Sequence, residues 1–181
     1  DGTRPQELYR FSSAEAMGEM IKIRYCLVPY LYSEFLRAAL NNEMMFRPLG
    51  FDFRDDSDAK QAEDQLLLGN EIMIAPIYKQ NANGRYVYLP EEMMLVRMRA
   101  YNDYETGILP KGHHYIPAKL EELIFFIRHG KAVPFGNPAA NTEQINKDDI
   151  RLLGYSGASY TLYSDDGISS DTDKTLSITE L

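Results

Sequence analysis

Helical and strand-like patterns alternate along the N-terminal part of this 181-residue chain, and their order constrains the fold more than any other feature. Apolar residues recur at helical spacing over Ser13–Leu40, which predicts one amphipathic helix. The short apolar run Met44–Leu49 predicts a strand. A second, capped helix is expected over Asp58–Leu68, with Gly69 closing it in the left-handed conformation. The next segment, Glu71–Ile77, is typical of a buried strand.

The long helix carries its own signals for a start, a bend and an end. Ser12-Ser13-Ala14-Glu15 predicts a capping box, in which the hydroxyl accepts a backbone N–H and the Glu reaches back. Pro29 predicts a kink, because it cannot donate a hydrogen bond to the Tyr25 carbonyl. Asn41-Asn42 is a helix stop. The apolar positions that define the expected buried face are Met17, Met20 or Ile21, Tyr25, Val28, Tyr32, Phe35, Leu36 and Ala39.

Strand-like segments follow at the spacing of roughly 8–12 residues that is typical of β-sandwiches. They are Arg85–Leu89, Met94–Tyr101, His113–Lys119, Leu123–Ile127, Lys131–Phe135, Ile150–Tyr155, Ser159–Tyr163 and Thr175–Ile178. The turn residues Ser156-Gly157 predict a hairpin between Ile150–Tyr155 and Ser159–Tyr163. The expected fold class is therefore α+β, with helices and one strand first and an antiparallel β-sandwich after them.

Composition excludes several classes of partner. The net charge is −8, from 19 basic and 27 acidic residues, and no basic stripe is present to bind a phosphate backbone, so no nucleic-acid partner is expected. No apolar run approaches the length of about 18 residues that a membrane span needs. Cys26 is the only cysteine, which excludes a disulfide framework and favours a buried thiol that packs as a small hydrophobe. The expected location is the cytoplasm.

Three pairs of adjacent acids are the first candidates for catalysis: Asp55-Asp56, Asp148-Asp149 and Asp165-Asp166. Neighbouring residues of a strand point to opposite faces, whereas acid–base catalysis needs two carboxyls that converge from separate elements. Turn residues in solvent are therefore the favoured interpretation. The acidic loop 165–173 could attract a hard cation, but it lacks the EF-hand ligand frame, and a charged hairpin tip is favoured.

Histidine, arginine and aromatic residues give no specific site. His113 and His114 are adjacent on a strand and His129 is remote from them, whereas a zinc site needs three or four converging ligands. Arg47 lies within an apolar run and must find carboxylate or carbonyl partners, so structural pairing is favoured over substrate contact. The 13 tyrosines and 8 phenylalanines could stack on sugar rings, but most occupy core-compatible positions. The residues indicate no cofactor and no metal.

Six ordered segments resemble glycoside hydrolase family 31, specifically its α-glucosidases. The segments are RYCLVPYLY (24–32), FRPLGFDFRDD (46–56), DQLLLGNEIMIAP (64–76), RYVYLP (85–90), FFIRHGKAVP (125–134) and YTLYSDDG (160–167). The resemblance covers nearly the whole chain, and the order of the six segments makes it specific. It implies a longer parent protein with a (β/α)8 catalytic barrel followed by two β-sandwich domains.

On this resemblance, residues 1–68 are the last repeats of the barrel, 69–140 the proximal sandwich and 141–181 the start of the distal one. The family is retaining and uses two aspartates whose motifs do not occur in this sequence. The resemblance therefore assigns no catalytic, substrate-binding or metal-binding residue here. Barrel active sites form at the carboxyl ends of strands, so the loops Thr3–Glu7 and Gly50–Asp56 are expected at the pocket rim, with Arg4, Phe51 and Asp52 as candidates.

The leading hypothesis is a structural, inactive portion of a retaining α-glucosidase that releases terminal glucose from short α-linked oligosaccharides. The alternative is a free-standing β-sandwich module that binds carbohydrate, which aromatic residues exposed on one sheet face would favour. The barrel edges that a truncated barrel leaves open are expected to cause self-association, because unpaired strand edges template pairing with another chain, or else to leave part of this region mobile.

Overall fold

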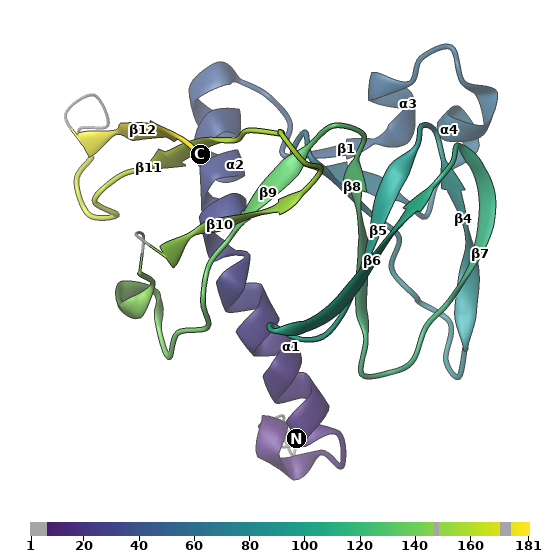
Figure 1. Cartoon of the computed structure of the whole chain (residues 1–181), viewed down its shortest axis with the longest axis horizontal. Coiled ribbons are helices and arrows are strands. Elements are labelled where there is room, and N and C mark those ends of the chain that lie inside the picture. Colours follow the sequence, from purple (N-terminus) through teal and green to yellow (C-terminus); the bar gives the residue numbers. More distant parts are fainter. Residues whose placement is uncertain (1–6, 147–148, 171–174) are drawn as a thin grey trace, which may run out of the picture.

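The computed structural model describes residues 7–146, 149–170 and 175–181 (Figure 1). The helical segments are η1 (Leu8–Arg10), α1 (Ala14–Cys26), α2 (Val28–Asn41), α3 (Leu49–Asp52), α4 (Ser57–Gln61) and η2 (Thr142–Gln144). The strands up to the fifth are β1 (Phe46–Pro48), β2 (Leu66–Leu68), β3 (Ile72–Ile74), β4 (Gly84–Leu89) and β5 (Met93–Ala100). The later strands are β6 (Asp103–Leu109), β7 (Gly112–Pro117), β8 (Leu123–Arg128), β9 (Ala132–Phe135), β10 (Arg151–Gly154), β11 (Thr161–Ser164) and β12 (Ser177–Glu180).

The predicted long helix is present as two helices, α1 and α2, which follow one another end to end, with β11 and β12 to their left and the six-stranded sheet to their right in Figure 1. The break falls at Leu27, and Pro29 lies in the first turn of α2, so the predicted interruption at the proline is confirmed. Asn42 ends α2 in the left-handed conformation, with φ of 55°, as predicted. The prediction of a capping box is wrong. Ser13 is the N-cap of α1 but makes no side-chain cap hydrogen bond, and its hydroxyl faces the Met17 sulfur at 3.6 Å.

The buried face of α2 differs from the prediction. Tyr32 and Phe35 were expected in the core but are exposed, whereas Tyr30, Ser33 and Glu34 are buried. Polar groups can be buried where hydrogen bonds replace those lost to water. The Ser33 hydroxyl, for example, accepts a hydrogen bond of 2.7 Å from the backbone N–H of Tyr163 in β11. Apolar periodicity therefore placed Leu36 correctly in the core, but it missed the polar residues that α2 buries and assigned to the core two aromatic residues that are exposed.

The expected helix over residues 58–68 is also wrong. Only α4 forms, and its cap is Asp56, whose carboxylate accepts hydrogen bonds from the backbone N–H groups of Asp58 and Ala59, both at 3.1 Å. Residues 66–68 instead form β2, which pairs antiparallel with β1 on one side and β3 on the other. Gly69 does adopt the left-handed conformation, with φ of 64°, but it closes the β2–β3 turn rather than a helix. Pairing on both sides of Leu66–Leu68 outweighs the helical tendency of its leucines.

Six strands form one antiparallel sheet in the order β1-β2-β3-β8-β5-β6. β1 lies at the edge of this sheet, and its register places Arg47 opposite Leu67. The sheet thus unites residues on both sides of the expected boundary at residue 68, and the division into three domains stays a prediction.

The predicted C-terminal hairpin is replaced by two other pairings. β10 pairs antiparallel with β9, and β11 pairs antiparallel with β12. Gly154, with φ of 156°, allows β10 to approach β9 closely, because a β-carbon at this residue would lie 2.5 Å from the Ala132 α-carbon. The segment between β10 and β11 therefore crosses from one pair of strands to the other instead of folding back on itself.

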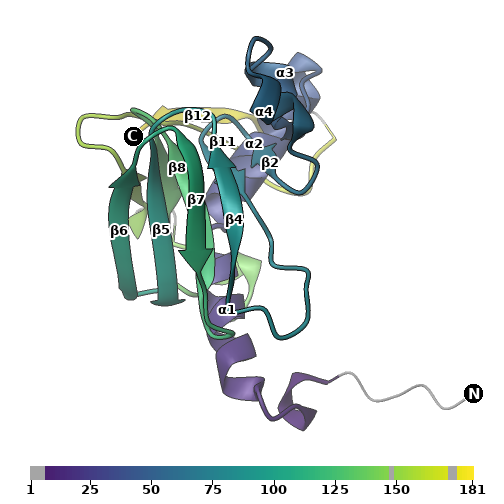
Figure 2. The ribbon, with the colours of Figure 1, turned by 90° about the vertical axis from the view of Figure 1, so that its right-hand side faces the viewer.

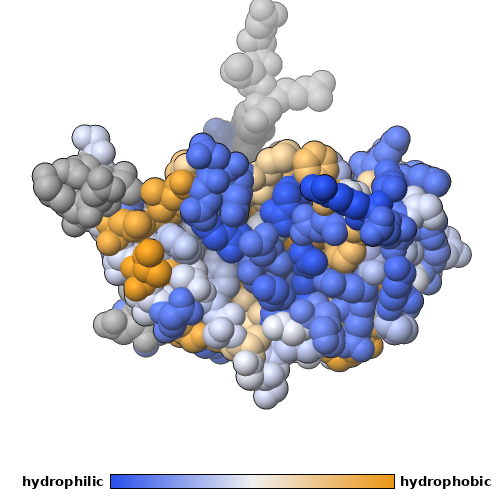
Figure 3. Space-filling model, turned by 90° about the horizontal axis from the view of Figure 1, so that it is seen from above, coloured by the Kyte–Doolittle hydropathy of each residue, from blue (hydrophilic) through white to orange (hydrophobic). Residues whose placement is uncertain are grey.

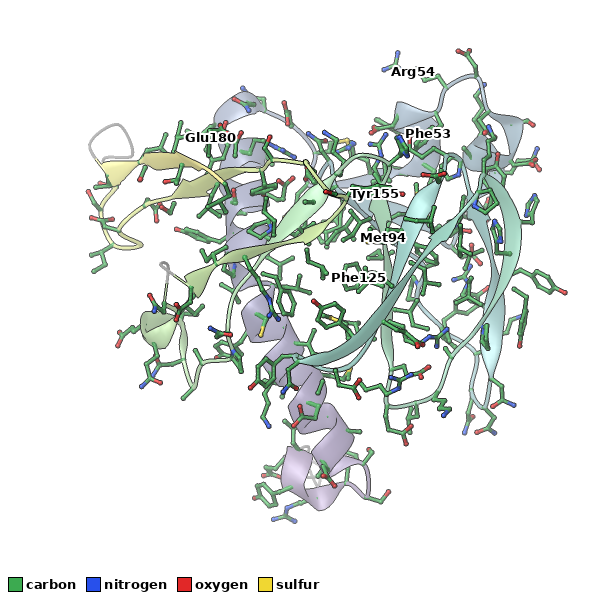
Figure 4. The ribbon with its side chains drawn as sticks, in the orientation of Figure 1. Phe53, Arg54, Met94, Phe125, Tyr155 and Glu180 are labelled. Carbon is green, nitrogen blue, oxygen red and sulfur yellow. The ribbon has the colours of Figure 1, made fainter. Side chains whose placement is uncertain are left out.

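Two hydrophobic cores lie on the two faces of the six-stranded sheet. One core joins the sheet to α1, α2 and the strands β9, β10 and β11. The other joins it to the two-stranded β4–β7 sheet, α3 and α4, and Figure 2 shows β4 and β7 lying over the six-stranded sheet. Met94 and Phe125 point from the sheet toward the helices (Figure 4). The prediction of N-terminal helices followed by antiparallel sheets is confirmed. No described helix has the length and apolarity of a membrane span.

The Gln65 side chain forms hydrogen bonds that connect the segment before β2 to the edge of β4 that does not pair with β7. Its side-chain amide donates to the Tyr88 carbonyl at 2.7 Å, and its amide oxygen accepts from the Tyr88 N–H at 2.8 Å. Replacing Gln65 by Ala leaves both buried backbone groups without these partners, so we expect the free energy of unfolding to fall by about 2–4 kcal/mol. Urea unfolding of this variant beside the exposed control Gln80→Ala measures the loss; equal curves would contradict it.

Candidate functional site

The loop that follows β1 is the part of the expected pocket rim that the structure describes. It contains α3 and α4 and lies at one end of the sheet (Figure 4). Phe53 lies toward the body of the molecule, where the Arg128 guanidinium sits 5.0 Å from its ring centre, whereas Arg54 points outward. Phe51 is exposed. The surface seen from this end is largely hydrophilic (Figure 3). Arg4, the third rim candidate, lies outside the described residues.

Asp52 is held by two arginines. Arg47 binds both carboxylate oxygens, each at 3.0 Å, and Arg128 donates to Oδ2 at 2.8 Å. Burial opposes ionisation of Asp52, but the hydrogen bonds and charges of the two arginines outweigh it and lower the pKa of the carboxyl. Glu91 accepts a further bond of 2.7 Å from Arg128. The prediction that Arg47 pairs structurally is confirmed, and Asp52 is its partner.

Asp56 is the second fixed carboxylate of the loop. Besides capping α4, it accepts hydrogen bonds from the Lys111 ammonium at 2.5 Å and the Tyr88 hydroxyl at 2.6 Å. These two hydrogen bonds lower the pKa of Asp56 well below its usual value. An open hollow of about 550 Å³ lies between the loop, Tyr88 and Lys111.

These carboxylates are ionised and saturated with donors. A general acid must carry a proton near neutral pH, and both Asp52 and Asp56 are held in the opposite state. Their chemistry is that of fixed anions which set the position of the loop. The loop can present Phe51 and Arg54 to a molecule outside it. Its carboxylates Asp52 and Asp56 cannot act as proton donors.

The structure separates the other candidates from this loop. Asp149 accepts from Asn146, and Asp165 and Asp166 accept backbone N–H groups of their own turn; Asp148 and residues 171–173 lie outside the described part. Each histidine has a different partner: His113 faces Asp58, His114 the Pro110 carbonyl and His129 Glu92. Among the described residues, no group of three or more His, Cys, Asp or Glu could hold a metal ion. Burial raises the pKa of Cys26 to about 11.

A buried network of Glu34, Arg37, Glu71, Tyr30 and Tyr160 was not predicted. The Tyr160 hydroxyl donates to Glu34 at 2.6 Å, and the Tyr30 hydroxyl lies 3.3 Å from Glu71. Arg37 pairs with Glu34 and lies 4.0 Å from Glu71. Burial, followed by the nearby Glu34 charge, raises the pKa of Glu71 to about 7. Side chains of α2, of the β2–β3 turn and of the segment before β11 thus meet at one point.

Replacing Asp52 by Asn tests the loop anchor. The variant loses charge-assisted hydrogen bonds to both arginines, and we expect the free energy of unfolding to fall by about 1–2 kcal/mol at pH 7. Because the folded pKa of Asp52 lies below its usual 3.8, this difference should be complete above pH 4 and disappear as the pH falls further. Urea titrations at pH 7 and pH 3, with the exposed Asp103→Asn as control, measure it. A difference that grows toward acid would contradict the assignment.

The architecture and the sequence together define a family. Residues 42–133 match the model of the glycosyl hydrolase family 31 C-terminal domain. This match covers more than half of the chain, which therefore belongs to glycoside hydrolase family 31, as its six segments predicted.

Relatives whose names give different activities match nearly the whole chain. The chain is 32% identical over 173 residues to alpha-glucosidase 2 of Bacillus thermoamyloliquefaciens, and the match covers 92% of this chain and 21% of the relative. It is 30% identical over 176 residues to an alpha-xylosidase of Saccharolobus solfataricus, covering 94% and 23%. A glucose complex of the Flavobacterium johnsoniae dextranase has the same fold, with a TM-score of 0.77 and 21% identity over 99% of this chain and 22% of the dextranase. The chain thus spans about one fifth of these proteins.

Proposed function

We propose that this chain is the structural support of a retaining α-glucosidase that removes terminal glucose from short α-linked oligosaccharides. The observation that carries the proposal is the 32% identity to an alpha-glucosidase over 92% of this chain. In a retaining glycosidase, one carboxylate attacks the anomeric carbon and a second carboxyl group, about 5–5.5 Å away, protonates the leaving oxygen. The two fixed aspartates of the loop after β1 do not suit this chemistry, so we place it in another part of the whole protein.

The exposed side chains of α2 and β1 support the barrel assignment of residues 1–68. Large apolar side chains are exposed along this part of the chain: Phe35, whose ring stacks with Tyr32, and Leu40, Met44, Phe46 and Phe51. Such a series marks a surface that packs against another body. We infer that the rest of the barrel covers these side chains in the whole protein, and that 69–140 and 141–181 contribute the two β-sandwich regions beside it.

The same exposed side chains predict self-association of the isolated chain. The outer edge of β1 has no strand beside it in the sheet order, and Met44 and Phe46 flank or occupy it. We expect sedimentation velocity to show dimers or larger species at tens of micromolar, because exposed apolar edges pair. Replacing Phe46 by Lys should return the chain to a monomer, whereas Tyr9→Lys, at an exposed site remote from β1, should not. A wild-type monomer at these concentrations would contradict the prediction.

The activity is tested on the whole protein with maltose, isomaltose, a nitrophenyl α-glucoside and a nitrophenyl α-xyloside. Proton NMR of the first products identifies the anomer released. We expect glucosides to be cleaved with retention, so that the α-anomer appears before it mutarotates. Preference for the xyloside would replace the proposed activity by that of the alpha-xylosidase relatives, and release of the β-anomer would overturn the mechanism.

A carbohydrate-binding module remains the second candidate, because one observation favours it. Tyr86 and Tyr115, which belong to neither hydrophobic core, are exposed on the outer face of the two-stranded β4–β7 sheet. They are compatible with the support role, since a support can also bind sugar.

A further inference from the structure

Three tyrosines form an exposed aromatic surface around the two-stranded β4–β7 sheet, which we call the tyrosine face. Tyr78, Tyr86 and Tyr115 are 66%, 72% and 52% exposed. Tyr86 and Tyr115 are opposite one another in the register of this sheet, with ring centres 5.2 Å apart and planes at 67°. Figure 2 looks onto β4 and β7, and the loop that contains α4 meets β4 at Tyr88, whose hydroxyl donates to Asp56.

The alternation of side chains along β4 and β7 explains why these rings point outward. Val87, Leu89 and Ile116 fill the core between the two-stranded sheet and the six-stranded sheet. Because successive side chains of a strand point to opposite faces, the neighbours Tyr86 and Tyr115 must face away from that core. An outer face of an antiparallel sheet is usually polar, so two large aromatic rings at its centre need a reason other than packing of this chain.

The tyrosine face is hollowed and has polar groups at its edge. A hollow of about 290 Å³ is lined by the three tyrosines together with Asp64, Gly84 and Arg85. Arg85 Nη2 lies 2.5 Å from Asp64 Oδ2, and the Tyr78 hydroxyl is 3.4 Å from the same oxygen. The Arg85 guanidinium also lies 5.8 Å from the Tyr78 ring centre. Carboxylate, guanidinium and phenol groups are thus fixed around an aromatic wall.

Gly84 keeps this hollow open at its floor. Its φ of 147° is rare for other residues, and a β-carbon there would lie 3.0 Å from the Tyr115 hydroxyl and overlap the Ile116 carbonyl. The absence of a side chain therefore leaves room for the Tyr115 ring to lie across the strand. The volume is close to the lower end of small-molecule sites, about 300 Å³, which suits one or two sugar rings rather than a large ligand.

We propose that the tyrosine face is a carbohydrate-binding site for a neutral α-gluco-oligosaccharide. A pyranose ring has an apolar face of C–H groups that packs on an aromatic ring, and hydroxyls at its edge that hydrogen-bond to carboxylate and guanidinium groups. The tyrosine face offers both kinds of partner within one hollow. The net charge of −8 disfavours an anionic ligand. The choice of glucose as the sugar rests on the proposed function.

Native gel electrophoresis of the whole 181-residue chain in gels with soluble starch or dextran tests the site. We expect the polysaccharide to retard the wild type, and Tyr86→Ala or Tyr115→Ala to weaken this retardation about tenfold, since each removes one aromatic wall. The matched control is Tyr9→Ala, which removes an equally exposed tyrosine from η1 and should bind as the wild type does. Circular dichroism and thermal unfolding establish that each variant is folded.

Each other outcome would overturn the site. Wild-type mobility that does not change with polysaccharide excludes it, as does equal retardation of Tyr86→Ala. Loss of binding in Tyr9→Ala as well would mean that the retention is nonspecific. If sedimentation velocity shows a dimer that Tyr86→Ala alone dissociates, the face is an interface between copies of the chain. The binding assay does not depend on turnover, so its result is independent of the activity assay. If the whole protein cleaves xylosides while this chain still binds glucans, the proposed activity is refuted and the binding site is not.

Discussion

Replacing Arg37 by Leu is expected to lower the free energy of unfolding at pH 7 by about 3 kcal/mol or more. Arg37 pairs with Glu34, whose side chain is 1% exposed, and lies 4.0 Å from Glu71. Removing one partner of a buried ion pair leaves an uncompensated buried charge, which typically costs about 3–5 kcal/mol. Some of this cost is relieved if a carboxyl takes up a proton, so we expect the lower end of the range.

The pH dependence separates this explanation from simple loss of packing. The folded pKa of Glu71 is about 7, above its usual 4.5, so the folded chain binds more protons than the unfolded chain between these values. Stability contributed by this group is therefore complete below pH 4.5 and falls as the pH rises through 7, at up to about 1.4 kcal/mol per pH unit. Without Arg37, the folded pKa of Glu71 should rise further and the decline should continue to higher pH.

Urea unfolding at pH 5 and pH 8 measures both effects. The deficit of Arg37→Leu relative to the wild type should be larger at pH 8 than at pH 5. Arg10→Leu is a suitable control, because Arg10 forms its ion pair with Glu7 on the surface, where such pairs contribute about 0–1 kcal/mol. A deficit that is the same at both pH values would indicate lost packing alone.

Gly69→Ala is the second substitution with a large expected effect. Gly69 has φ of 64°, and a β-carbon there would overlap the Glu34 carboxylate and the Tyr30 hydroxyl and lie 2.6 Å from Glu34 Cδ. The left-handed conformation costs Ala about 1 kcal/mol, and displacing tightly packed groups costs about 1–3 kcal/mol more. Since these groups belong to the buried network, we expect a total loss of about 2–4 kcal/mol.

Gly130→Ala separates the two contributions. Gly130 has φ of 66° and nothing within 4 Å of its would-be β-carbon, so this variant carries only the backbone cost. We therefore expect Gly69→Ala to lower the midpoint of thermal unfolding distinctly more than Gly130→Ala does. Equal shifts of the two midpoints would show that the turn at Gly69 relaxes without disturbing the network.

Local signals in the sequence predicted several features of the fold. Pro29, Asn42 and Gly69 act through their own backbone chemistry, and the structure places an interruption, a helix end and a left-handed residue there. The core strand β8 likewise follows from the continuous apolar run Leu123–Ile127. Such signals depend on a few neighbouring residues, so they survive without knowledge of the tertiary structure.

Features that depend on distant partners could not be predicted in this way. Glu34 is buried because Tyr160 and Arg37 satisfy it, and the former lies 126 residues away in the chain. The pairing of β10 with β9 competes with a local turn at residues 156–157, and the sequence favours the local alternative. One signal was available for the network: Tyr30, Glu34 and Arg37 share one helix face at spacings of four and three.

The candidate site likewise contains some features that local sequence signals predicted and others that depend on distant partners. The apolar context of Arg47 indicated that it needed a structural partner, but only the structure identifies Asp52 and shows Arg128 sharing it. The outward rings of Tyr86 and Tyr115 were missed, because alternation along β4 and β7 does not say which face is covered. The register of the antiparallel pair β4 and β7 brings the two rings together.

The measurement that most directly tests whether this chain supports catalysis rather than performing it is turnover by the purified 181-residue chain. Maltose, isomaltose and a nitrophenyl α-glucoside are incubated with the folded chain, and released glucose or nitrophenol is followed to high enzyme concentration. We expect no turnover above the uncatalysed rate. Hydrolysis that is abolished by Asp52→Asn or Asp56→Asn would contradict this assignment and place a catalytic carboxylate in the loop after β1.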